Sequence, residues 1–308
     1  MSAKTAVKKI NNKIKDPAED KIFYAVVYIV MILFVAVCGI PLLHVVAASL
    51  SSGSAVSSGR VALWPVDFSF ESYIYVFSYR NVMNSFWNSI VYTVVGTIIK
   101  MVFCMVLAYP MARSNKIPGW KWIIIFILIP NYFGPSVIPQ SINISNLGMM
   151  NTMWAVIFPA AMPIGSAITT RVFLTNGING ELQDAADIDG CSDIQFFFQM
   201  VLPLSKVIIA TNAMMFISDY WNSYFSAMIY LRDDTKYPLQ LVLRNLLSGA
   251  SRASMQDFED PEMMAGKAGL ADLLRYAFCV IATLPMVVVY PFVQRYLVQG
   301  TMDGAVKG

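Results

Sequence analysis

The chain has few charged residues and almost no histidine. Charged side chains make up 13% of its 308 residues, whereas a soluble domain averages about 25%. His44 is the one histidine, which excludes a metal site built from several histidines. The four cysteines, Cys38, Cys104, Cys191 and Cys279, lie far apart and show neither metal-ligand spacing nor a disulfide framework. We therefore expect no metal bound by this chain.

The sequence also lacks a phosphate-binding loop and a catalytic constellation. Gly266-Lys267 is followed by alanine and lacks the earlier glycine of the Gly-x4-Gly-Lys-Ser/Thr motif. Ser166 has no nearby base that could activate it as a nucleophile. The net charge of +3 comes from lysines concentrated near the N-terminus and indicates no nucleic-acid partner. We expect this chain not to be an enzyme and not to bind ATP or Mg itself.

Hydrophobic residues make up 57% of the chain and fall into long runs. A helix needs about 20 apolar residues to cross the hydrocarbon core of a bilayer. The sequence therefore predicts an all-α, polytopic membrane bundle with six transmembrane helices. The six predicted spans cover residues 22–48, 86–112, 122–140, 153–170, 207–231 and 277–294.

The distribution of lysine and arginine predicts the orientation of these spans. Six crossings return both termini to one side, and the lysine-rich segment 1–21 places that side in the cytoplasm. We expect a transmembrane domain over residues 22–298 and a cytoplasmic tail over 299–308. The internal stretch 172–205 has no basic residue and five acids, which calls for another explanation. Its acids are Glu181, Asp184, Asp187, Asp189 and Asp193.

That stretch contains the signals of two short helices joined by a turn. Asn179 can cap the first helix, and Gly190 can end it in the left-handed conformation. Ser192 can cap the second helix, which runs to Leu202 and the proline that opens the fifth span.

The same loop, over about residues 175–204, carries the family resemblance. The loop contains Asp184-Ala185-Ala186, then Gly190 after three residues, Met200 after nine more, and Leu202-Pro203 after one more. This pattern resembles the coupling-loop signature of ABC import permeases. The family begins this signature with Glu and has Ile before Leu-Pro, so Asp184 and Met200 are conservative departures. The alternative is an ordinary amphipathic connecting loop. The candidate coupling residues are Glu181, Asp184, Ala185, Ala186, Gly190, Leu202 and Pro203.

The resemblance implies a fold and a set of partners. The fold is the permease fold of type I ABC importers, in the cytoplasmic membrane of a bacterium. The partners are a homologous second permease, two copies of an ATPase that uses ATP and Mg, and an extracellular solute-binding protein or lipoprotein. The coupling loop is expected to dock into a cleft on the ATPase and to move the membrane spans.

Two further stretches resemble the maltose-type carbohydrate branch of this family. They are Asp219-Tyr-Trp-Asn222 and the terminus from Val298 to Gly308. The resemblance implies a sugar cargo, expected to be an oligosaccharide, moved by alternating access. It also makes Gly304, Ala305 and Lys307 candidates for an ATPase contact, with a frayed chain end as the alternative.

Polar residues inside the spans are candidates for the transport path. Lys100 and Asp219 are the formal charges there, and they either pair structurally, contact another subunit or line a cavity. Asp219 and Asn222 share one helix face, with Trp221 and Tyr224 on a neighbouring strip. Proline and glycine clusters predict breaks in the third and fourth spans. Near the first break, Asn131 and Tyr132 are weaker path candidates. Interfacial aromatic residues and packing kinks are the alternatives.

Other functions stay open at this point. The cargo could be an amino acid or an anion instead of a sugar. A proton-coupled secondary transporter would use Lys100 and Asp219 as a relay and need no ATPase. A membrane-embedded enzyme would need clustered His, Asp or Ser side chains, which the sequence lacks.

Overall fold

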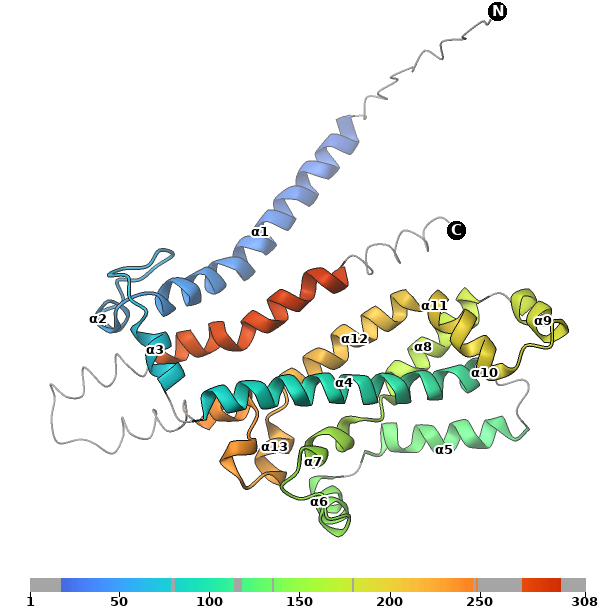
Figure 1. Ribbon diagram of the computed structural model, residues 1–308. Helices are drawn as coiled ribbons and strands as arrows, with labels where there is room; N and C mark the ends of the chain where they lie inside the picture. Colours follow the sequence, from blue (N-terminus) through green and yellow to red (C-terminus); the bar gives the residue numbers. More distant parts are fainter. Residues whose placement is uncertain are drawn as a thin grey trace, which may run out of the picture.

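The protein is helical, and most of its helices run side by side (Figure 1). The computed structural model describes residues 18–78, 81–113, 118–134, 136–178, 180–245, 248 and 273–294. No β-strand occurs within these ranges. The N-terminal tail up to residue 17 and the segment 295–308, with Gly304, Ala305 and Lys307, lie outside them.

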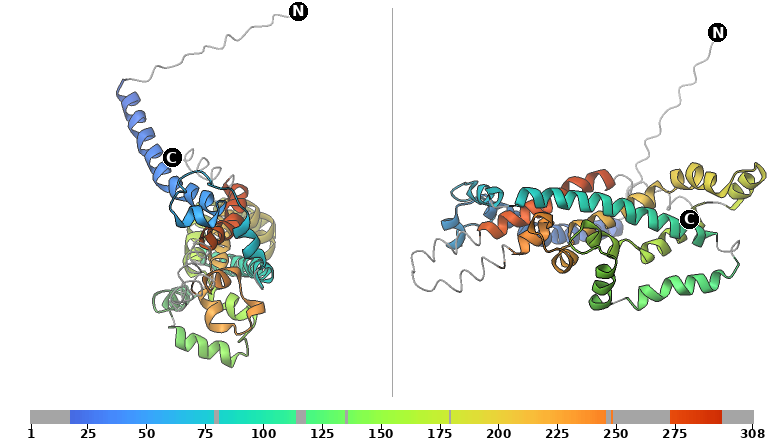
Figure 2. Two further views of the ribbon diagram at one scale, coloured as in Figure 1. Left: turned by 90° about the vertical axis from the view of Figure 1, so that its left-hand side faces the viewer. Right: turned by 60° about the horizontal axis from the view of Figure 1, so that its bottom comes forward.

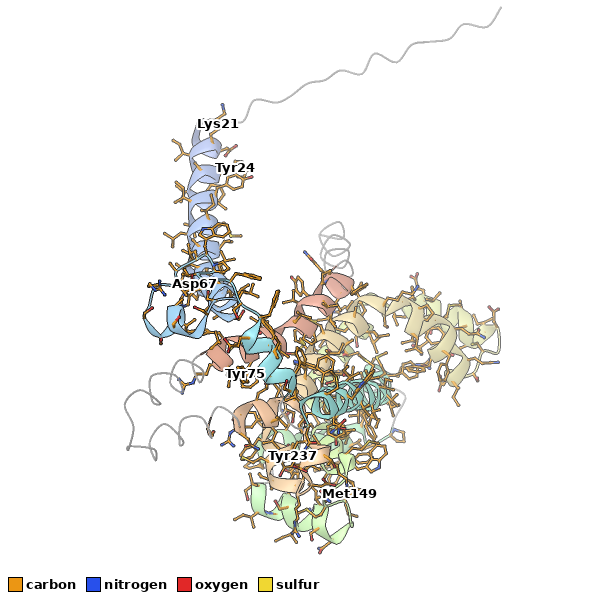
Figure 3. All side chains as sticks on the ribbon, turned by 60° about the vertical axis from the view of Figure 1, so that its left-hand side comes forward. Lys21, Tyr24, Asp67, Tyr75, Met149 and Tyr237 are labelled. Atoms are coloured by element: carbon orange, nitrogen blue, oxygen red, sulfur yellow. The ribbon has the colours of Figure 1, made fainter. Side chains whose placement is uncertain are left out.

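The first helix, α1 (Ala18–Ser49), packs against the other elements only at its C-terminal end, and the rest of it stands away from them (Figures 1 and 2). None of its most apolar 18-residue window is buried. Figure 3 shows the side chains of Lys21 and Tyr24 extending from α1 with no helix beside them. A helix that is hydrophobic all round requires lipid or another protein around it. This helix contains the predicted span 22–48 and is long and apolar enough to cross a membrane.

Helix α4 (Val82–Ala112) is central to the bundle and contains the predicted span 86–112. It packs against both α8 (Ile164–Gly177) and α12 (Lys206–Trp221). Helices α4 and α12 approach closely at Gly96, where an added Cβ would lie 2.7 Å from the ring of Tyr220 in α12. Small residues at such crossings let membrane helices approach closely.

Three helix pairs in the described residues are bent at a short break between their two helices. The bend is 110° between α5 (Trp120–Tyr132) and α6 (Val137–Asn146). It is 49° between the α7–η2 segment Met153–Ala160 and α8, and these two bends confirm the predicted breaks. A third bend of 78° separates Asp193–Leu204 from α12. The described residues therefore hold three long apolar helices, or up to six spans if each bent pair counts as one.

The predicted continuous helix over residues 207–231 is wrong. Helix α12 ends at Trp221, and a separate short helix, α13, covers Phe225–Tyr230. At this end the Asn222 side chain donates a hydrogen bond of 2.9 Å to the carbonyl oxygen of Ser218. Asparagine side chains compete with backbone hydrogen bonds in this way and favour helix ends. The span 122–140 is also divided, as predicted, because α5 stops at Tyr132, two residues after Pro130.

Several short helical elements lie toward the end of the bundle where α4 begins. They are α2 (Gly53–Ser57), α3 (Glu71–Ser78), α7 (Met153–Ile157), η2 (Phe158–Ala160), α13, η4 (Asp234–Lys236) and helical residues 239–245. The Asn88 amide donates to the carbonyl oxygens of Thr235 and Tyr237, and Ser89 Oγ accepts from the Leu239 amide at 2.7 Å. Hydrogen bonds from Thr235 hold the pKa of Asp233 below its usual value. These contacts fasten the loop after α13 to α4.

The last described helix, Leu273–Gln294, contains the predicted span 277–294. Its residues Ala277 and Phe278 form a buried cluster with Val82 of α4 and Trp221 of α12. The helix therefore packs against the end of the bundle that holds the short elements.

We predict that Gly96→Ala destabilises the protein. Its methyl group would overlap the Tyr220 ring, whose hydroxyl is tied to the Ile157 carbonyl oxygen at 3.0 Å. Overpacking of this kind costs about 1–3 kcal/mol. Thermal unfolding of the purified protein in detergent should show a lower Tm.

Gly39→Ala is the matched control, because Gly39 also lies in a long helix and an added Cβ there meets nothing within 4 Å. Equal Tm values for Gly96→Ala and Gly39→Ala would contradict the close α4–α12 contact.

Candidate functional site

The candidate coupling loop forms two helices with a glycine turn, as the sequence predicts. The first, α9, covers Gly180–Ile188. Gly190 has φ +72° and its amide donates to the Asp187 carbonyl oxygen, while the Cys191 amide donates to that of Ala186. This pair of bonds is the Schellman motif, which favours glycine at the left-handed position. The proposed cap at Asn179 lies outside the described residues.

The second helix begins at a capping box and then widens. Ser192 accepts from the Gln195 amide, and the Gln195 side chain accepts from the Ser192 amide, which confirms the predicted cap. Helix α10 (Asp193–Phe196) continues as a π-helix, η3 (Phe197–Val201), and as α11 (Leu202–Leu204). Pro203 has no amide N–H to donate. The chain then turns at Ser205 into α12.

The coupling loop presents charged and apolar side chains on its outer surface. Asp184 and Ala185 are exposed, and so are Ile188 (87%) and Ile194 (71%). Ala186 instead packs against the buried cluster that contains Cys104 and Phe196. Of the two candidate alanines, Ala185 therefore faces outward and Ala186 faces the bundle. Glu181 is exposed, Leu202 is half-buried and Pro203 is exposed.

Arg113, at the end of α4, contacts both helices of the coupling loop. Its guanidinium forms an ion pair with Asp193 of α10 and lies 3.8 Å from a carboxylate oxygen of Asp187 in α9. It also donates to the Tyr109 hydroxyl at 2.7 Å and lies 5.5 Å from the ring centre of Phe196. The Arg113 side chain is only 9% exposed. Figure 1 places the loop beyond this end of α4.

Lys100 and Asp219, the two charges of the predicted spans, lie together. Lys100 Nζ donates to Asp219 Oδ2 at 2.8 Å. The Lys100 side chain is 9% exposed and that of Asp219 is 57% exposed. The ammonium group also lies 4.9 Å from the ring centre of Phe216 and 5.5 Å from that of Tyr220. The sequence left open whether these charges pair structurally, contact another subunit or line a cavity. In the structure they pair with each other within this chain.

A polar cluster one turn farther along α4 joins three helices. The Asn212 amide of α12 donates to Thr170 Oγ1 of α8 at 2.8 Å and lies 3.6 Å from Cys104 Sγ of α4. All three side chains are buried. Polar side chains that bond across helices hold membrane bundles together.

The other path candidates do not form one site. Trp221 is 3% exposed and donates through Nε1 to the Ala282 carbonyl oxygen in the last helix. This burial does not support a role for Trp221 in the transport path. Asn222 and Asp219 are both exposed. Tyr224 is 41% exposed and lies after the end of α12, so it shares no helix strip with Trp221.

Asn131 and Tyr132 lie elsewhere, at the end of α5, and both are exposed, Tyr132 to 76%. Their side chains therefore belong to a separate surface from the Asp219 region.

Two apolar grooves of about 300 and 470 Å³ run along α4 and share Thr97 and Ile98. The hydroxyl oxygens of Thr93 and Thr97 are buried beside them without a hydrogen-bond partner in the described part of the chain. The described residues also hold no group of three or more His, Cys, Asp or Glu that could bind a metal ion.

Comparison with known proteins finds relatives along most of the chain. The polygalacturonan/rhamnogalacturonan transport system permease protein YtcP of Bacillus subtilis is 33% identical over 290 residues, covering 94% of this chain and 100% of the relative. The melibiose/raffinose/stachyose import permease protein MelC of the same organism is 29% identical and covers 87% of this chain and 91% of the relative. No family model matches the chain.

A solved structure is also similar. It is a chain of a bacterial ABC transporter involved in the import of the acidic polysaccharide alginate, with 29% identity and a TM-score of 0.77. The similarity covers 92% of this chain and 99% of that chain.

We predict that removing Asp219 destabilises the protein more than removing Lys100 does. Asp219→Asn leaves the buried ammonium of Lys100 without its counter-ion, whereas Lys100→Met leaves a half-exposed carboxylate. Breaking a buried ion pair costs about 3–5 kcal/mol, and the exposure of Asp219 lowers this to about 1–3 kcal/mol. Thermal unfolding in detergent measures both effects.

The double variant Lys100→Met with Asp219→Asn should recover part of the loss, because no unpaired charge remains. Asp67→Asn is the control, since Asp67 pairs with Arg60 in an exposed position. Equal losses for the two single variants would contradict the asymmetry of the pair.

Proposed function

Because the chain belongs to the permease subunits of bacterial sugar ABC transporters, we propose that it forms part of the membrane channel of an ATP-driven oligosaccharide importer. It crosses the cytoplasmic membrane six times, with both termini in the cytoplasm. A homologous second permease pairs with it. Two ATPase copies bind ATP and Mg below the membrane, and an extracellular solute-binding protein delivers the cargo.

The coupling loop is the observation that carries this proposal. It forms two short helices around Gly190, beyond one end of α4 (Figure 1). Ile188 and Ile194 are apolar and exposed on it, next to the exposed carboxylate of Asp184. An exposed apolar surface with a polar rim is typical of a site where another protein docks. The partner that fits is the ATPase, which this chain needs because its sequence lacks a phosphate-binding loop.

Two chain connections lead from the loop into the bundle. Helix α8 ends at Gly177, shortly before α9, and α12 begins at Lys206, after the turn at Ser205. Both helices pack against α4. Closure of the ATPase pair therefore displaces the loop and moves these helices with it, which supports alternating access to the cargo.

The proposed cargo is an oligosaccharide, by analogy with the relatives. Their printed names include a polygalacturonan/rhamnogalacturonan system and a melibiose/raffinose/stachyose system. Asp219 and Asn222, both exposed at the end of α12, offer the carboxylate and amide groups that bind sugar hydroxyls.

A proton-coupled transporter is the alternative, and the Lys100–Asp219 pair is the feature that favours it. Such a transporter needs no ATPase. The two functions therefore differ in whether hydrolysis of ATP accompanies uptake.

We predict that Gly190→Pro and Asp184→Lys abolish stimulated ATP hydrolysis by the assembled importer. Proline cannot adopt the positive φ of Gly190 and has no amide for its bond to Asp187. Lysine reverses the charge at the docking surface. The complex would be purified with its permease, ATPase and solute-binding partners, and hydrolysis measured with raffinose or trigalacturonate, a neutral and an acidic oligosaccharide.

Gly59→Pro is the matched control. Gly59 has φ +68° and its amide also donates to a backbone carbonyl, but it lies between α2 and α3. Hydrolysis should stay stimulated in this variant. Full stimulation in both loop variants, or no ATPase in the purified wild-type complex, would overturn the importer and favour the proton-coupled transporter.

A further inference from the structure

Arg113 is the one described side chain of α4 with ion pairs to both helices of the coupling loop. Asp187 lies in the last turn of α9, and Asp193 is the first residue of α10. We name the set Arg113, Asp187, Asp193 and Tyr109 the Arg113 clasp. These contacts come from three helices.

The two carboxylates of the clasp lie at opposite kinds of helix end. A carboxylate at the start of a helix is stabilised by the helix dipole, whereas one in the last turn is destabilised. Asp193 is in the favourable position and Asp187 is in the unfavourable one. The guanidinium of Arg113 offsets the charge of Asp187, so the end of α9 depends on a residue of α4.

The burial of Arg113 makes the clasp specific. A guanidinium that is 9% exposed needs paired carboxylates and hydrogen bonds to offset its lost hydration. Its planar fork can reach two acceptors in fixed directions, which the single ammonium group of lysine cannot. Nη1 forms the ion pair with Asp193 and donates to the Tyr109 hydroxyl, whereas Nη2 forms the ion pair with Asp187.

We propose that Arg113 is a positioning residue that transmits movement of the coupling loop directly to α4. This inference rests on the proposed function. The chain itself connects the loop only to α8 and α12, so the clasp adds a third, noncovalent connection. Lys100 lies 13 positions earlier on α4, about 20 Å away along a helix. The clasp thus joins the loop to the helix that carries the charge pair of the bundle.

The test is the number of ATP molecules hydrolysed per sugar molecule transported. It uses proteoliposomes of the complete complex, with raffinose or trigalacturonate, whichever stimulates hydrolysis. Arg113→Gln should raise this ratio about tenfold, a size typical of coupling between two sites. Asp193→Asn should raise it too, and it neutralises an exposed carboxylate on which folding depends less. Arg113→Lys should give an intermediate ratio, because lysine keeps the charge but not the fork.

Two controls separate positioning from stability. Val76→Ala removes volume from the buried cluster at the opposite end of the bundle and lowers the number of active complexes without changing the ratio. Arg60→Gln breaks an exposed ion pair and should leave the ratio unchanged.

A wild-type ratio in Arg113→Gln and Asp193→Asn, with hydrolysis still stimulated, would overturn the clasp as a positioning device. If Arg113→Gln fails to assemble, Arg113→Lys and Asp193→Asn decide the question by the same ratio. Absence of stimulated hydrolysis in the wild-type complex would overturn the proposed function itself, and the inference with it.

Discussion

Helix α4 supplies one partner to four polar contacts that hold other parts of the protein against it. In hydrocarbon no water can satisfy such groups, so each must find its partner within protein. Along α4, Ser89 bonds the loop after α13, Lys100 pairs with Asp219, Cys104 joins the cluster with Thr170, and Arg113 binds the coupling loop. These contacts fix the register of α8, α12 and the loop against one helix.

The parts of this arrangement that depend on local chemistry could be predicted from the sequence. Apolar runs of sufficient length predicted the long helices, since the bilayer sets their length. Gly190 and Ser192 were predicted in their observed conformations, because a Schellman turn and a capping box are each decided within a few neighbouring residues. The breaks at the proline clusters follow from the missing amide N–H of proline.

The parts that depend on distant partners could not be predicted. Trp221 looks like a path residue by spacing, but the carbonyl oxygen of Ala282 in the last helix holds it in the core. In the sequence, Arg113 is a basic residue directly after the predicted span 86–112. The five acids of the stretch 172–205 without a basic residue were the signal that a cation from elsewhere pairs with them. Finding that cation required the fold.

The same contacts restrict how the protein can change shape during transport. Separating α4 from α12 would leave the Lys100 ammonium without Asp219, and separating α8 from α12 would leave the Asn212 amide without Thr170. Either change costs more than sliding an apolar surface. We therefore expect these three helices to keep their mutual packing during transport. The surfaces free to change their neighbours are those without such polar contacts, which include α1, with its uncovered apolar window, and the two apolar grooves along α4. Rearrangement is thus expected between these three helices and their surroundings, and the clasp at Arg113 lies where they meet the loop.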